Sequence, residues 1–142
     1  VLQLVSHHIG PVRVLREILA EVTSLTERRC AQLDLDIVDL DTELLLKVAQ
    51  LSRSISVNDR LCVIACEHHE WTCVTNDRAL RKVCKDHQVP VRRGLGLMVD
   101  LVRVGALTES RALRVAAMIR KENPAHITEA LFEDFRARLR RS

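Results

Sequence analysis

The chain has 142 residues, of which 47% are hydrophobic and 29% charged, and its formal net charge is +3. This composition predicts one globular domain with its own hydrophobic core and excludes an intrinsically disordered chain. No apolar run approaches the roughly 18 residues that cross a bilayer, and no signal peptide is recognisable. The five cysteines are typical of reduced thiols. We therefore expect a cytoplasmic protein without a membrane partner.

The first third of the chain predicts two helices and a strand. Apolar residues recur at helical spacing over 11–30, which predicts a helix with Glu21 at the edge of its apolar stripe. Residues 33–40 favour a short strand because aliphatic residues dominate its centre. Thr42 is the expected N-cap of a helix over 43–51.

The rest of the chain predicts two further strands and five further helices. Ser56 and Asp59 form a capping-box variant, Ser-x-x-Asp, at the start of a helix that runs to about residue 68. The β-branched residues of WTCVT (71–75) favour a buried strand. The remaining expected elements are a helix over 77–87, a strand over 89–91, and helices over 95–104, 109–121 and 129–141.

This order of elements is that of an α/β domain, in which helices flank a short parallel sheet. We place the α/β domain at residues 1–107 and a helical C-terminal extension at 108–142. Right-handed crossovers put the strand-to-helix turns along one edge of such a sheet. Ligand sites lie outside the carboxyl ends of the strands, so a functional site is expected at that edge.

The tripeptide Asn-Asp-Arg occurs twice, and each time it opens an apolar helix. Asp59 heads the first helix and Asp77 the second, directly after the strand 71–75. An acid in a first turn stabilises a helix through its dipole and is most often an ordinary cap. Two such carboxylates at one edge of a sheet would also suit a hard divalent cation. Both interpretations remain open at this point.

From about Val12 to Leu107 the sequence resembles the PIN-domain family, whose members are metal-dependent nucleases that include toxins of toxin–antitoxin pairs. Four segments support the resemblance: EILAEV (17–22), SVNDRLCVIAC (56–66), CVTNDRALRKVC (73–84) and VPVRRGLGLMVDLVRVGAL (89–107). The resemblance implies a three-layer α/β fold and hydrolysis of RNA through a carboxylate-bound divalent cation.

The resemblance also implies which residues form the site. Glu21, Asp59 and Asp77 would bind Mg²⁺ or Mn²⁺, and Thr75 and Asn76 would hydrogen-bond the carboxylates or a metal-bound water. Arg60, Arg78 and Arg81 would hold the RNA backbone through charge-assisted contacts. If the chain is a toxin, an antitoxin protein would be its partner. The apolar stripes of the last two helices suit packing against the domain, a homodimer partner or an antitoxin helix.

One feature of the family is missing from this sequence. The family begins with a central strand that ends in an aspartate, whereas VLQLVSHHIGP (1–11) contains no acid. Three explanations remain: a truncated chain, a non-catalytic member, or substitution by another residue. The alternative function is therefore a catalytically degenerate module that keeps the fold and binds RNA or a protein partner.

Overall fold

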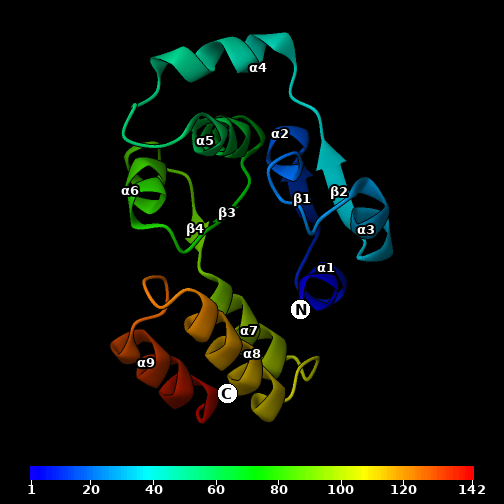
Figure 1. The fold of residues 1–142 in the computed structure, drawn as a ribbon, viewed down its shortest axis with the longest axis vertical. Coiled ribbons are helices and arrows are strands. Elements are labelled where there is room, and N and C mark those ends of the chain that lie inside the picture. Colours follow the sequence, from blue (N-terminus) through cyan, green and yellow to red (C-terminus); the bar gives the residue numbers. More distant parts are fainter.

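The computed structural model describes residues 1–142 and contains nine α-helices, one short 3₁₀ helix (η1) and four short strands (Figure 1). In chain order the elements are α1 (Leu2–His8), β1 (Val12–Leu15), α2 (Arg16–Leu19), α3 (Glu27–Gln32), β2 (Leu35–Val38), α4 (Thr42–Lys47), η1 (Val48–Gln50), α5 (Val57–His69), β3 (Cys73–Val74), α6 (Arg78–Asp86), β4 (Val91–Arg92), α7 (Gly94–Arg103), α8 (Glu109–Glu122) and α9 (Glu129–Leu139). The expected α/β class with a helical C-terminal part is confirmed.

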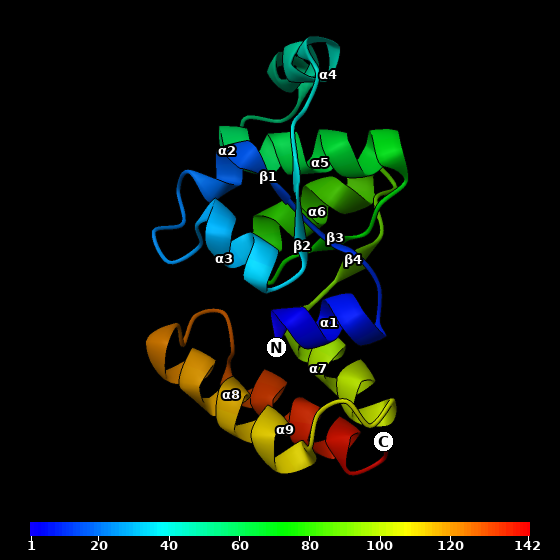
Figure 2. The same ribbon diagram turned by 90° about the vertical axis from the view of Figure 1, so that its right-hand side faces the viewer.

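The four strands form two separate parallel sheets. In the first sheet β1 pairs with β2, from Val12 opposite Leu35 to Leu15 opposite Val38. In the second sheet β3 pairs with β4, with Cys73 opposite Val91. Each strand therefore has one neighbour and one open edge. In Figure 2, α5 and α6 lie above β3 and β4, and α4 lies above α5.

The expected helix over 11–30 is wrong in its first part. Residues Val12 to Leu15 form β1, and only a short helix, α2, follows before a turn leads into α3. The β-branched residues Val12 and Val14 suit a strand. The spacing of the apolar residues in this segment fits the period of a strand as well as that of a helix. Pairing with β2 selects the strand over the helix, because it satisfies the backbone groups of β1 that face β2 and buries Leu15.

The later elements agree with the sequence predictions within a few residues. The Ser56 side chain accepts the Asp59 backbone N–H, so the predicted cap of α5 is confirmed. The N-cap of α4 is Asp41, whose carboxylate accepts the Leu44 N–H at 2.9 Å, and not Thr42. Gly105 follows α7 with a φ of +74°, a left-handed conformation that favours glycine after a helix.

The chain has two main hydrophobic cores, and the elements that form them lie one above the other in Figure 1. The upper core is built mainly from α4, α5 and α6 with the strands, and buries Val63 and Cys84 completely. The lower core joins α1, α7, α8 and α9 around Leu101 and Phe135. We call these the α/β body and the helical body. Helix α7 belongs to the expected range 1–107 and packs in the helical body. None of the helices is both long enough and apolar enough to span a membrane.

Candidate active site

Glu17 stands directly after β1, in the first turn of α2. Its side chain is half-buried, and its Oε2 atom is buried without a hydrogen-bond partner. A buried polar atom without a partner is unfavourable by about 1–3 kcal/mol, and more when it is charged. Such groups are rare in native proteins, so each needs an explanation in terms of an ion, a water or a function.

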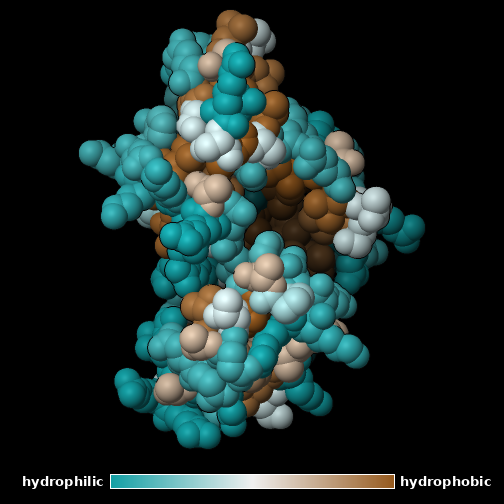
Figure 3. Space-filling view, turned by 60° about the vertical axis from the view of Figure 1, so that its left-hand side comes forward, coloured by the Kyte–Doolittle hydropathy of each residue, from teal (hydrophilic) through white to brown (hydrophobic).

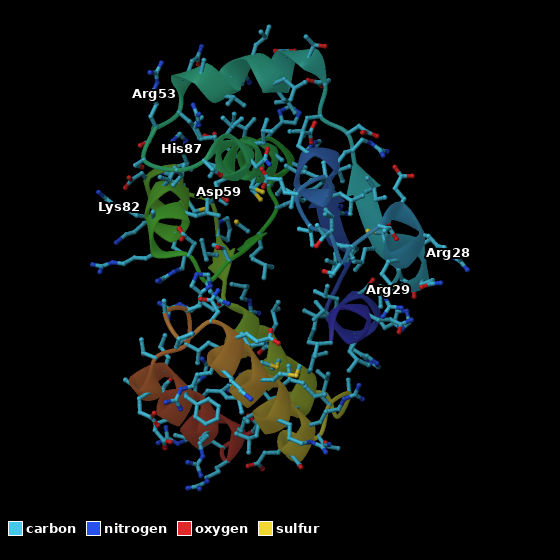
Figure 4. All side chains as sticks on the ribbon, viewed as in Figure 1. Arg28, Arg29, Arg53, Asp59, Lys82 and His87 are labelled. Atoms are coloured by element: carbon cyan, nitrogen blue, oxygen red, sulfur yellow. The ribbon has the colours of Figure 1, made fainter.

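Asp59 lies in the first turn of α5, where Ser56 accepts its backbone N–H at 3.1 Å. Its side chain is half-buried, and Figure 4 shows it below α5, on the side that faces the strands. The neighbouring labelled residue Lys82 points away from the α/β body instead. The helix N-terminus stabilises the Asp59 carboxylate electrostatically while leaving it available for a ligand.

The pKa of the Cys62 thiol responds to the charges of both acids. Burial, followed by Cys73 and then by Asp59, Cys84 and Glu17, raises the pKa of Cys62 to about 12. The charges of Asp59, on α5, and of Glu17, on α2, are among the smaller of these causes. Burial also raises the pKa of Cys84 to about 12. These thiols stay protonated near neutral pH, which makes them poor nucleophiles and poor metal ligands.

The other two predicted metal ligands, Glu21 and Asp77, have exposed side chains. Glu21 is exposed in the turn after α2, where its backbone N–H bonds the Ile18 carbonyl. Asp77 is also exposed, and its Oδ1 caps α6 by accepting the Leu80 N–H at 2.7 Å. No group of three or more His, Cys, Asp or Glu side chains is arranged to hold a metal ion. The structure therefore does not assemble the predicted set of Glu21, Asp59 and Asp77.

The pair of Glu17 and Asp59 does fit a hydrated divalent cation. Both side chains offer hard oxygen donors, and a cation would compensate the buried, unpartnered Oε2 of Glu17. Mg²⁺ usually retains several waters and takes only one or two carboxylates from a protein. The prediction missed Glu17 because a helix over 11–30 turned it toward solvent. The available signal was the β-branched pair Val12 and Val14, which places Glu17 just after a strand.

The polar residues beside Asp77 hold the chain in place. The Oγ1 atom of Thr75 accepts the Asp77 N–H at 3.1 Å. The Oδ1 atom of Asn76 accepts the Gly94 N–H at 3.2 Å, which ties the end of β3 to the start of α7. Both oxygens therefore fix the turn between β3 and α6, and the assignment of Thr75 and Asn76 to a metal site stays a prediction.

The three predicted RNA-binding arginines have different surroundings. Arg60 donates from Nη1 to the Val48 carbonyl at 3.2 Å, a contact between α5 and η1. Arg78 is exposed at the start of α6. Arg81 lines an open pocket of about 530 Å³ together with Lys85 and Arg93, and no acidic side chain lines that pocket. The Nε atom of Arg81 is buried without a partner. The charged residues in the lining of this pocket are therefore all basic.

The capping bond of Asp77 predicts how substitutions at this position affect stability. Asp77→Ala is expected to lower the free energy of unfolding by about 1 kcal/mol, because the Leu80 N–H loses its acceptor. Asp77→Asn keeps an oxygen at the cap and is expected to change stability by much less. Urea unfolding of the two variants measures the difference. Equal losses in both variants would show that the charge, and not the cap, matters at this position.

Comparison with known proteins agrees with the resemblance of the sequence segments. The family model of the PIN domain matches residues 8–86, which is more than half of the chain. No curated protein and no solved structure matches the chain. The matched range includes Glu17 after β1, Asp59 on α5 and Asp77 at the start of α6. The chain therefore belongs to the PIN-domain family.

Proposed function

We propose that this protein is a nuclease that hydrolyses RNA phosphodiester bonds with a divalent cation, Mg²⁺ or Mn²⁺, held by Glu17 and Asp59. The observation that supports this most directly is the buried, unpartnered oxygen of Glu17 beside the end of β1. Membership of the PIN family points to a nuclease in general. The cation and the substrate are part of the proposal.

Both carboxylates lie on anchored backbone, which suits a role as metal ligands. Glu17 is fixed on a short helix against β1, and Asp59 is fixed by the cap of α5. A divalent cation held by Glu17 and Asp59 would supply Lewis-acid chemistry for hydrolysis of a phosphodiester by water. The carboxylates hold their positions because each backbone is anchored independently. Their partial burial strengthens attraction to a cation, since it reduces screening by solvent.

The pocket of Arg81, Lys85 and Arg93 supports a polyanionic substrate. Three cations without a lining acid would attract phosphate groups, and arginine can contact a phosphate through two parallel hydrogen bonds. Base stacking has little support, because the chain contains only one Trp, two Phe and no Tyr. We therefore expect contacts mainly to the backbone, with a strong dependence of affinity on salt.

The test is cleavage of a labelled structured RNA by the purified chain, with a single-stranded DNA of the same sequence in parallel. We expect cutting in Mn²⁺ or Mg²⁺, none in EDTA, and recovery when excess Mn²⁺ is added back. Contamination by common metal-independent ribonucleases would appear as cutting that survives EDTA. RNA binding in EDTA without cutting in either cation would contradict the nuclease and favour the non-catalytic module. A toxin role with an antitoxin partner, and a homodimer, stay predictions.

A further inference from the structure

The pocket lined by Arg81, Lys85 and Arg93 is built from α6, α7 and the segment that connects α6 to β4. Arg81 and Lys85 lie one turn apart on α6, and Arg93 is the N-cap of α7. The lining between them continues through residues 88–91. We call this site the basic pocket. Its volume of about 530 Å³ is in the range of small-ligand sites, and neither candidate metal ligand lines it.

The cations of the basic pocket have no counter-ion within the protein. Arg81, Lys85 and Arg93 take part in none of the ion pairs of the structure. The adjacent Arg92 differs, because its guanidinium pairs with Asp100 at 2.7 Å. The Nε atom of Arg81 is also buried without an acceptor. Like charges in one pocket repel one another, and a buried donor without an acceptor is unfavourable, so a bound anion would compensate both effects.

Hydrogen bonds hold the backbone of the basic pocket in place before any ligand binds. The Val89 N–H donates to the Cys84 carbonyl at 2.8 Å, which fixes the exit from α6. The next residues form β4, which pairs with β3. Beside Arg93, the Gly94 N–H donates to the Asn76 side chain at 3.2 Å. A site whose backbone is already fixed loses little conformational entropy when a ligand binds.

The basic pocket differs from the apolar groove that lies between the two sheets. Figure 3 brings forward the side of the molecule on which α6 lies in Figure 1, and it shows a hollow with a hydrophobic lining within a mostly hydrophilic surface. Apolar side chains dominate the lining of the groove. In the basic pocket every charged residue is a cation, and Gln88 adds a polar amide. This lining indicates a small ligand that has an anionic group.

We propose that the basic pocket binds a phosphate monoester, with Arg81 and Arg93 in contact with its terminal oxygens and Lys85 as a further counter-charge. A monoester has three terminal oxygens and a charge of about −1.5 to −2 near pH 7. A phosphodiester within a nucleic acid has only two such oxygens and one negative charge. Each arginine can contact two phosphate oxygens in parallel, so two arginines and a lysine use more oxygens than a diester offers.

Two kinds of molecule supply this chemical group: an RNA with a 5′-terminal phosphate and a free mononucleotide. Binding of either ligand in the basic pocket requires no divalent cation and no cleavage, so it is measured in EDTA. The proposal therefore goes beyond the proposed nuclease function. Absence of RNA cleavage in Mn²⁺ or Mg²⁺ would contradict the nuclease and leave the phosphate site standing.

The test compares two RNAs of the same sequence, about ten nucleotides long, of which one has a 5′-phosphate and the other a 5′-hydroxyl. Fluorescence anisotropy of a 3′-terminal label measures the affinity of the purified chain for each RNA at about 0.15 M salt. We expect the 5′-phosphate RNA to bind about tenfold more tightly, since a hydrogen bond to a charged group has about this effect. Competition by uridine 5′-monophosphate, with uridine as its control, tests the free mononucleotide.

The outcomes distinguish the two sources of the phosphate. Tighter binding of the 5′-phosphate RNA without competition by the mononucleotide would assign the pocket to the end of an RNA. Competition without a difference between the RNAs would assign it to a free mononucleotide, and both results together would show that it accepts either ligand. Equal affinity for the two RNAs, together with no competition, would overturn the proposal.

Substitutions in and beside the basic pocket locate the bound phosphate. Arg93→Gln changes an exposed residue, and Arg81→Gln removes a buried Nε–H without a partner, so both variants are expected to fold and to lose the phosphate effect. Lys82→Gln is the matched control, because Lys82 does not line the pocket and points away from the α/β body (Figure 4). A phosphate effect that survives in both arginine variants, or an equal loss in Lys82→Gln, would overturn the assigned site.

Discussion

Glu17→Gln and Asp59→Asn are each expected to lower cation-dependent RNA cleavage by about 100-fold or more. Loss of a residue that merely supports a metal ligand typically lowers affinity or activity 10- to 100-fold, so loss of a direct ligand has at least that effect. Both substitutions keep the shape of the side chain and remove its charge. Single-turnover cleavage rates at saturating Mn²⁺ and calorimetric Mn²⁺ binding measure the two consequences separately.

The stability of the same variants distinguishes a functional role from a structural one. The Oε2 atom of Glu17 has no hydrogen-bond partner, so removal of its charge is expected to leave the free energy of unfolding unchanged or to raise it. Glu21→Gln is the matched control, because Glu21 follows in the same segment but is exposed. Full activity in Glu17→Gln together with loss of activity in Glu21→Gln would show that Glu21, as expected from the sequence alone, is the metal ligand and that Glu17 is not.

Phe135→Ala is expected to destabilise the helical body by about 3–5 kcal/mol. Phe135 is the largest of the completely buried side chains and packs among residues of α7, α8 and α9. Its truncation removes apolar contacts and leaves a cavity that surrounding helices fill only partly. Urea unfolding followed by far-ultraviolet circular dichroism measures the loss of helix.

Fluorescence of Trp71 provides a second view of the same unfolding, because this residue packs against the core of the α/β body. Coincident transitions in both signals would show that the two bodies unfold together. Phe132→Ala is the matched control, since Phe132 is only partly buried at the edge of the same core. A loss in Phe135→Ala no larger than in Phe132→Ala would contradict the importance of this packing.

The sequence by itself determined the elements from α5 onward and the helix starts at which Asp59 and Asp77 lie. Ser56 with Asp59 is a local signal, because the capping bond forms between residues three apart. The apolar periodicity of α7, α8 and α9 is likewise local and strong over ten residues or more. The family resemblance depended in part on the segments of α5 and α7, and it correctly indicated an α/β fold with short parallel strands.

Only the tertiary structure decided the first third of the chain and the surroundings of the candidate site residues. Residues 12–15 contain apolar residues that suit a helix or a strand, and pairing with β2, more than 20 residues away, selects the strand. That choice leaves the side chain of Glu17 half-buried just after β1 and leaves Glu21 in solvent. The division into two sheets, with an apolar groove between their edges, also depends on long-range packing. Periodicity describes neighbours along the chain, and it contains no information about which strand edges stay open.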